Sequence, residues 1–177
     1  MLDFFKTAAN LKKIPRQGWI DKLSLNNPES VADHSYSMAV MSMVISDLGK
    51  YDSEKILKMA LLHDLSESDI GDYTPEQISK EKKSKLENDA FNEIIKKLPD
   101  SIQSHYLKIW QEYQENNSPE SKIVHQIDRL EMVLQAKLYQ KEGHPKEKLY
   151  SFFESAKIDI VHPKLKELFR KILEDTP

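Results

Sequence analysis

The stretch with the clearest chemical potential runs from residue 60 to residue 75, ALLHDLSESDIGDYTP. Its apolar start predicts a buried helix that ends by presenting His63 and Asp64 side by side. The segment that follows adds three more carboxylates: Glu67, Asp69 and Asp72. An imidazole with several carboxylates close by is typical of a metal site. A His-Asp pair alone is weak evidence, because short motifs recur by chance.

Two residues elsewhere in the chain strengthen this interpretation. His34 lies in the first turn of a helix that a capping box at Ser30 predicts, where the helix dipole disfavours imidazolium and so favours the neutral ring that a metal needs. A lone histidine in that position is more often a surface or capping residue. Asp128 lies beside an apolar helical stripe, between Ile127 and Leu130. A buried, ionised carboxylate there requires a cation, which can be Arg, Lys or a metal.

Together, His34, His63, Asp64 and Asp128 lie on three different predicted helices. Two imidazoles and two carboxylates suit a divalent transition metal such as Mn, Fe, Co, Ni or Zn. His63 and Asp64 are about 100° apart around a helix, close enough to contact one ion. The chain has no cysteine, so any metal is held by nitrogen and oxygen ligands.

The elements that must position these residues are predicted to be helices. Only 4 glycines occur, and 31% of the residues are charged, a balance that favours helices over a turn-rich β architecture. Periodicity and capping signals predict a series of helices separated by breaks, among them the linker 15–29. We expect helices over 2–13, from Ser30 to Leu48, from Asp52 or Ser53 to Asp64, from Thr74 to Leu98, over 102–113, from Ser118 to about 140, and over 146–157 and 163–174.

Arg16 and Trp19 lie in the linker 15–29, which the glycine, proline and asparagine content predicts to be irregular. The simplest interpretation is a surface arginine and a tryptophan packed over the core. His125, one turn before Asp128, is expected to be a neighbour of the metal ligands or a surface residue. Asp69 has the weakest claim of the acidic group, and we expect it to face solvent.

Length and charge limit the number of domains and the kinds of partner that this chain can have. A chain of 177 residues suits a single domain, 1–177, with the motifs in about 1–142. The net charge of −3 and the absence of a basic run give no electrostatic footprint for nucleic acid. No signal peptide or membrane-spanning stretch is evident, so we expect a cytoplasmic protein.

Four ordered motifs carry a resemblance to a known family. They are PRQGW (15–19), PESVADHSYSMAVM (28–41), ALLHDLSESDIGDYTP (60–75) and IDRLEMVLQA (127–136). The order of their residues, His…His-Asp…Asp, resembles that of the HD-domain metal-dependent phosphohydrolases. The sequences of the motifs are most similar to the 5'-deoxynucleotidase branch of that superfamily, which includes the group called HD domain-containing protein 2. The resemblance implies an all-α, single-domain HD-fold helical bundle.

The resemblance also implies roles for individual residues. It implies a divalent cation (Mn, Co, Fe, Ni, Zn or Mg) on His34, His63, Asp64 and Asp128, and Glu67 as the residue that aids catalysis. Arg16 would orient the phosphate, Trp19 would lie against the nucleoside, and Asp72 and Thr74 would lie near the substrate. A possible second ion would use Glu67, Asp72 and the Tyr73 carbonyl. Family members commonly form homodimers.

The expected activity is metal-dependent hydrolysis of deoxyribonucleoside 5'-monophosphates to deoxynucleoside and phosphate. Within the superfamily the alternative is hydrolysis of another nucleotide: a dNTP, a cyclic nucleotide or an alarmone. The alternative outside the enzymes is a non-catalytic, metal-stapled helical module, in which the metal ion only stabilises the fold. Arg16, Glu67 and Asp72 argue against a staple, because none of them is an expected ligand of the first ion.

Overall fold

In the computed structural model, which describes residues 1–175, the chain consists of helices joined by short connections. They are α1 (Leu2–Asn10), the 3₁₀ helix η1 (Leu11–Lys13), α2 (Gln17–Leu23), α3 (Val31–Leu48), α4 (Ser53–Leu62), α5 (Glu67–Ile70), α6 (Lys80–Ile95), α7 (Asp100–Glu115), α8 (Pro119–Lys141), α9 (Lys146–Asp159) and α10 (Pro163–Glu174). Within this range the extended pairing is a single isolated bridge between Pro15 and Ser30. The all-α prediction is confirmed. Residues 176 and 177, the last two of the expected domain, lie outside the described part.

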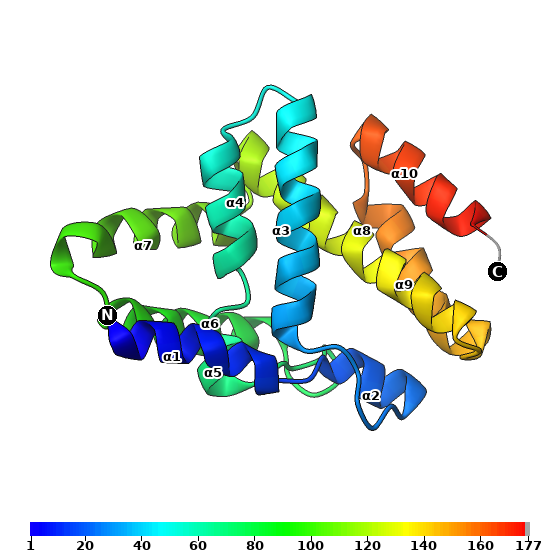
Figure 1. Cartoon of the computed structure of the whole chain (residues 1–177), viewed down its shortest axis with the longest axis horizontal. Coiled ribbons are helices and arrows are strands. Elements are labelled where there is room, and N and C mark those ends of the chain that lie inside the picture. The colour runs from blue at the N-terminus through cyan, green and yellow to red at the C-terminus, as the bar shows by residue number, and fades with distance from the viewer. Residues whose placement is uncertain (176–177) are drawn as a thin grey trace.

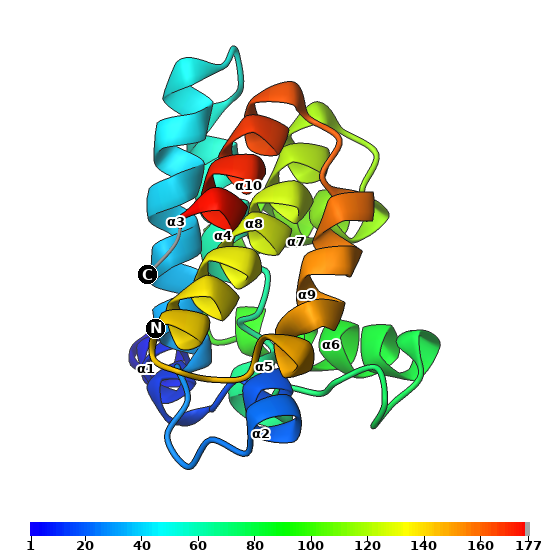
Figure 2. The same ribbon diagram turned by 90° about the vertical axis from the view of Figure 1, so that its right-hand side faces the viewer.

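The helices are arranged around α3 and α8. Helix α3 packs against both α4 and α8, while α9 and α10 pack on the other part of α8. Helices α1, α5 and α6 pack together beyond one end of α3 (Figure 1). The view at right angles shows α8, α9 and α10 as a layer of three helices beside α3 (Figure 2). The site residues lie where α3, α8 and the end of α4 meet.

Local signals explain where the two central helices begin. The Ser30 hydroxyl accepts from the Asp33 N–H while the Asp33 carboxylate accepts from the Ser30 N–H, which completes the predicted capping box of α3. Ser118 caps α8 in the same way, with Pro119 in the first turn, where its missing N–H costs nothing. The Ser30 cap places His34 in the first turn of α3.

The linker 15–29 is not irregular throughout, because it contains α2. Trp19 and Leu23 are one turn apart and both buried, so the helix is held by packing against the core. Gly18 lies inside α2, facing Phe152 of α9, with room for an ordinary contact. Composition led to the wrong prediction here, since burial of the Trp19–Leu23 face outweighs the low helix propensity of Gly18.

The helix expected to start at Thr74 begins six residues later. Thr74 does begin a turn: its N–H donates to the Gln77 side chain at 3.2 Å, and its carbonyl accepts from the Gln77 N–H at 3.0 Å. They close only one turn. Ser79 then provides a second cap by accepting from the Lys82 N–H, and α6 starts at Lys80.

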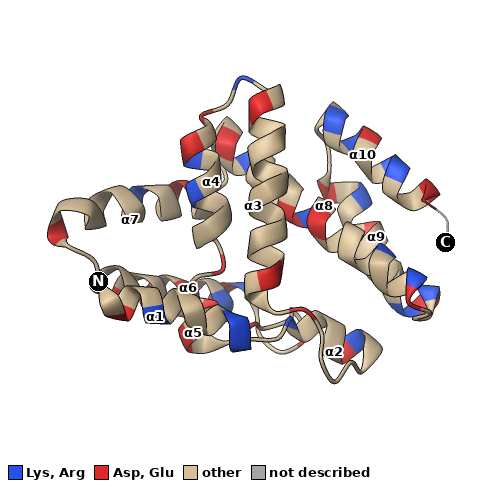
Figure 3. Ribbon diagram, in the orientation of Figure 1, with Lys and Arg blue, Asp and Glu red and all other residues tan. Residues whose placement is uncertain are grey.

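Acidic and basic side chains are mixed along most helices, consistent with the small net charge (Figure 3). None of the helices in residues 1–175 is long and apolar enough to cross a membrane.

Candidate metal centre and active site

Three helices bring the predicted metal ligands together. His34 Nε2 lies 3.3 Å from His63 Nε2 and 3.3 Å from Asp128 Oδ1. Asp64 Oδ2 lies 3.0 Å from His63 Nε2 and 3.8 Å from His34 Nε2. His34, His63 and Asp128, from distant parts of the sequence, thus place one donor atom each within 4.8 Å of one another, and Asp64 adjoins the two histidines.

The far sides of both imidazoles determine what the near sides can bind. Nδ1 of His34 donates to the Glu131 carboxylate at 2.6 Å, and Nδ1 of His63 donates to the Ala60 carbonyl at 2.8 Å. Each ring in its neutral form then has its proton on Nδ1 and a lone pair on Nε2. Two lone pairs facing each other at 3.3 Å repel unless a cation lies between them. The donor set thus fits a divalent ion held by nitrogen and oxygen.

The charges around this point also call for a cation. Burial alone would lower the pKa of His34, but hydrogen bonds to Asp128 and Glu131 raise it to about 10. Burial likewise opposes ionisation of Asp128, yet the His34 contact holds the pKa of that carboxyl well below its usual range. Such a concentration of negative charge is met either by a proton on His34 or by a metal ion in its place.

Arg16 is brought to the site by backbone pairing. The Pro15–Ser30 bridge places the segment before α2 alongside the segment before α3, with the Arg16 N–H donating to the Glu29 carbonyl at 3.0 Å. The Arg16 guanidinium lies 3.3 Å from Asp64 and 3.8 Å from Asp72. The Arg16 side chain therefore lies next to the predicted ligands but comes from a different segment, the one before α2. A guanidinium has five N–H donors, so others remain for a substrate.

Glu67 is the most deeply buried of the predicted catalytic residues, at 1% exposure. Its Oε1 lies 3.3 Å from the Lys83 ammonium, and its Oε2 has no hydrogen-bond partner among the described residues. Burial, followed by the charges of Asp64 and Asp72, raises the pKa of Glu67 well above its usual range. A carboxyl with a raised pKa and an oxygen without a hydrogen-bond partner is suited to proton transfer.

Asp72 is placed by a turn that requires glycine. Gly71 has φ of +84°, which reverses the chain after α5. Asp72 Oδ2 then accepts from the Gln17 N–H at 2.9 Å and faces Arg16. The Tyr73 carbonyl, the third member of the expected second-ion set, accepts from Lys83 at 3.1 Å.

Trp19 and Thr74, expected near the substrate, are engaged elsewhere in the protein. Trp19 is 2% exposed, its ring lies 4.4 Å from that of Phe152, and its N–H donates to Glu29 at 2.7 Å. Thr74 is also buried and donates to Asp21 at 3.2 Å. The geometry thus agrees with the simpler interpretation of Trp19 as a packing residue. The substrate contacts of both residues stay predictions.

The two residues assigned minor roles lie outside the ligand set. Asp69 is exposed and 3.6 Å from Lys97, as expected of a solvent-facing carboxylate. His125 is stacked on Tyr113 at 4.1 Å, and the Tyr113 ring is 5.9 Å from that of His63. Tyr113 thus lies between His125 and the predicted ligand His63.

Sequence reasoning missed three residues that hold the site residues in place: Glu131, Lys83 and Gln17. A signal existed for Glu131, because it follows Asp128 by three positions and so shares its helix face. Lys83 lies in the charge-rich start of α6, where a solvated side chain is the usual expectation. Gln17 acts through its backbone N–H, which no side-chain pattern can reveal.

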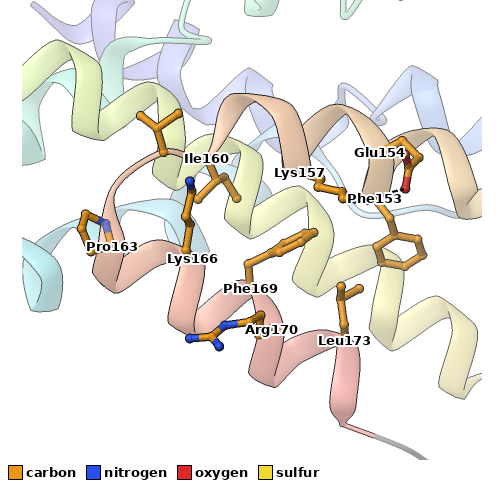
Figure 4. Close-up of a pocket in the computed structure, with 10 residues that line it drawn as sticks. Phe153, Glu154, Lys157, Ile160, Pro163, Lys166, Phe169, Arg170 and Leu173 are labelled. Atoms are coloured by element: carbon orange, nitrogen blue, oxygen red, sulfur yellow. Dashed lines mark ion pairs between the residues drawn. The ribbon is translucent and has the colours of Figure 1, made fainter.

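A separate groove lies between α9 and α10, with a volume of about 710 Å³. Figure 4 shows Phe153, Ile160 and Phe169 inside it, with Lys166 and Arg170 at its edge. Its lining includes none of the predicted site residues. The groove is therefore separate from the candidate metal centre, which lies where α3, α8 and the end of α4 meet.

Comparison with known proteins agrees with this geometry. The family model described as HD domain matches residues 8–169. The chain belongs to the HD domain family. The fold and the family that the four motifs predicted are thereby confirmed.

Relatives within the HD domain family cover nearly the whole chain. The 5'-deoxynucleotidase HDDC2 of Dictyostelium discoideum is 41% identical, with 98% of this chain and 97% of the relative covered. The human protein of that name is 36% identical, with 97% of this chain and 84% of the relative covered. Among solved structures, the PH0347 protein from Pyrococcus horikoshii is 31% identical with a TM-score of 0.76, covering 97% of this chain and 98% of the other. A conserved hypothetical protein from Pyrococcus furiosus is 28% identical with a TM-score of 0.77, covering 98% and 99%.

Proposed function

We propose that this HD-domain protein is a metal-dependent phosphomonoesterase that converts deoxyribonucleoside 5'-monophosphates to deoxynucleoside and phosphate. The observation that carries the proposal is the meeting of His34, His63 and Asp128 within 3.3 Å contacts beside Arg16 and Glu67. The substrate class comes from the relatives, which are named 5'-deoxynucleotidases and align over nearly all of this chain.

The metal would be held by His34, His63, Asp64 and Asp128. When bound, a divalent ion supplies charge neutralisation at a phosphoryl oxygen and a lowered pKa for water. The Nε2 atoms of His34 and His63, oriented by hydrogen bonds at Nδ1, are already directed to the position that it would take.

The chain's own side chains would orient the substrate and move the proton. The Arg16 guanidinium, steadied by Asp64 and Asp72, is suited to hold two phosphate oxygens at once. Glu67, with its unpartnered Oε2, is suited to take a proton from the attacking water or to give one to the leaving alkoxide. Trp19 and Thr74 remain proposed substrate contacts.

The first test is phosphate release from a set of nucleotides with Mn, Co, Fe, Ni, Zn or Mg added in turn. We expect deoxyribonucleoside monophosphates to be hydrolysed faster than AMP, with dAMP, dGMP and TMP closer to one another. Equal rates on dAMP and AMP would contradict the sugar preference. Preferred hydrolysis of a dNTP or a cyclic nucleotide would assign the chain to another HD-domain activity.

Two variants separate an enzyme from a metal-stapled module. Asp64→Ala should lose both bound metal and turnover. Glu67→Ala should keep its metal and its melting temperature but lose about 10²-fold or more in rate, the usual scale for a proton-transfer group. Wild-type activity in Glu67→Ala would mean that the proton-transfer group is misassigned.

We further propose a homodimer in the cytoplasm, with residues 1–177 as one domain. Light scattering coupled to size-exclusion chromatography tests the oligomeric state, since a monomer of 20.6 kDa is readily distinguished from a dimer.

A further inference from the structure

The ammonium group of Lys83 lies in the middle of a cluster of oxygens next to the metal centre. Its Nζ is 3.1 Å from the Tyr73 carbonyl oxygen and 3.3 Å from Glu67 Oε1. Glu87 Oε1 at 3.6 Å and Asp72 Oδ1 at 3.8 Å complete its surroundings. These groups come from α5, from the loop after Gly71 and from α6 itself, so the tertiary fold assembles the cluster.

The spacing of the cluster fits an ammonium group. Distances of 3.1–3.8 Å are those of N–H···O hydrogen bonds and ion pairs. The carboxylates of Glu67, Asp72 and Glu87 are therefore arranged around the Lys83 ammonium.

A cation already present opposes the entry of another. The family resemblance implies a second divalent ion on Glu67, Asp72 and the Tyr73 carbonyl, yet these are the groups that Lys83 contacts. An ion on the same oxygens would stand within a few ångströms of the ammonium, and two cations so close in a partly buried site repel strongly. The residues as arranged therefore do not fit a second ion.

We propose that the Lys83 ammonium permanently takes the place of a second metal ion, so that this chain binds one divalent ion, at His34, His63, Asp64 and Asp128. Lys83 is then a positioning residue for the proposed phosphomonoesterase reaction. This second part rests on the proposed function, whereas the number of ions does not.

The contacts of Lys83 explain what it positions. It holds Oε1 of Glu67, which leaves Oε2 buried and without a partner among the described residues. It also faces one oxygen of Asp72, while the other accepts from the Gln17 N–H and faces Arg16. Lys83 and Arg16 therefore each face a different oxygen of Asp72, and the Lys83 contact with Oε1 orients the Glu67 carboxylate.

The first experiment counts ions without using activity. Wild-type protein, Lys83→Met and the control Lys82→Met are dialysed against Mn²⁺ and analysed for manganese per chain, and Mn²⁺ binding is followed by calorimetry. Lys82 is a suitable control because its side chain is exposed on the same turn of α6. We expect one ion in the wild type and in Lys82→Met, and a second, weaker ion in Lys83→Met.

Two results would overturn the proposal. Two ions in the wild type would mean that Lys83 yields to the metal, and one ion in a folded Lys83→Met would mean that the cluster cannot hold an ion at all. If Lys83→Met does not fold, Lys83→Gln replaces it, and the wild-type count remains decisive by itself.

The second experiment tests positioning with dAMP as substrate. We expect kcat of Lys83→Met to fall at least tenfold with little change in KM, and to recover in part at millimolar Mn²⁺ as the second ion enters. Lys82→Met should match the wild type. Unchanged kcat in Lys83→Met would overturn the positioning role. If the wild type hydrolysed no mononucleotide, the proposed function would be refuted. The number of bound ions would then still test whether Lys83 takes the place of a second ion.

Discussion

At the level of single residues, the atoms on the far side of an imidazole determine the chemistry on its near side. Asp128 and Glu131 lie on one face of α8 and contact opposite nitrogens of His34: Asp128 Oδ1 is 3.3 Å from Nε2, and Glu131 Oε2 is 2.6 Å from Nδ1. One helix thus supplies both a ligand and the group that orients another ligand. Such outer partners raise the basicity of the ring and fix its tautomer.

The first prediction concerns Glu131. Its replacement by alanine should weaken metal binding about 10- to 100-fold, because His34 loses the acceptor that keeps its proton on Nδ1. The measurement is a Mn²⁺ titration in competition with a chelator. Glu142→Ala, at the exposed end of α8, is the control and should bind as the wild type does. Unchanged affinity in Glu131→Ala would show that His34 is held by packing alone.

The second prediction concerns Glu29, which accepts from Trp19 and lies close to Glu131. Burial, with a smaller contribution from the Glu131 charge, raises the pKa of Glu29 from 4.5 to about 7. The folded state therefore binds a proton that the unfolded state releases between these values, so the stability of the fold decreases as pH rises from about 4.5 to about 7. Glu29→Gln should remove this loss.

The test compares urea unfolding of metal-stripped wild type and Glu29→Gln at pH 5 and pH 8. We expect the variant to gain on the order of 1–3 kcal/mol relative to the wild type at pH 8, and much less at pH 5. The comparison within each pH cancels the titration of the other groups. An equal difference at both pH values would argue against a raised pKa.

At the level of the elements, connections position the catalytic groups as much as helices do. Helix α4 ends at Leu62, and the turns that follow carry His63, Asp64 and then Glu67 at the start of α5. Gly71 next reverses the chain and presents Asp72 to Arg16. The segment between α4 and α6 thus presents its carboxylates without a regular helix through all of them.

The third prediction follows from this turn. Gly71→Ala should destabilise the fold by about 1–3 kcal/mol, because the extended conformation with φ of +84° and ψ of 164° is unfavourable for a residue with a Cβ atom. It should also lower kcat/KM by displacing Asp72. Thermal unfolding and dAMP hydrolysis measure the two effects.

Gly18→Ala is the matched control for Gly71→Ala. Its added Cβ atom would lie 3.7 Å from Phe152, an ordinary contact within α2. Alanine should be neutral or stabilise the helix by up to about 1 kcal/mol. Equal losses in the two variants would mean that the conformation of Gly71 is not the cause.

For the molecule as a whole, the metal centre joins parts of the chain that are far apart. Helices α3 and α8 and the end of α4 meet there, and α8 also supports α9 and α10. An ion bound by ligands from all three would bind the folded state and not the unfolded chain. Its affinity therefore adds to the free energy of unfolding.

The fourth prediction is that removing the metal destabilises the whole fold. With free ion at about 100 times its dissociation constant, binding contributes about 2.7 kcal/mol, so EDTA should lower the melting temperature by roughly 5–10 °C in a chain of this size. His63→Ala, which lacks a ligand, should melt at the same temperature with and without EDTA. A wild-type melting temperature indifferent to EDTA would contradict the assigned centre.

Local sequence signals were enough to predict most helices and to single out the residues that we propose as metal ligands. Capping at Ser30 and Ser118 and helical periodicity are local properties, readable over a few residues. The four motifs singled out His34, the His63-Asp64 pair and Asp128 as predicted ligands, at three separate places in the chain. The apolar neighbours of Asp128 in the sequence already indicated that its carboxylate needed a cation.

The support of these residues, in contrast, depends on tertiary packing. Burial of Trp19 and Leu23 makes a helix of a segment that glycine content predicted to be irregular, and a second cap at Ser79 delays α6. The partners Glu131 and Lys83 act across 97 and 16 positions of sequence, respectively. Such contacts depend on which faces of distant helices meet, and that is determined by packing of the whole core, which no local pattern encodes.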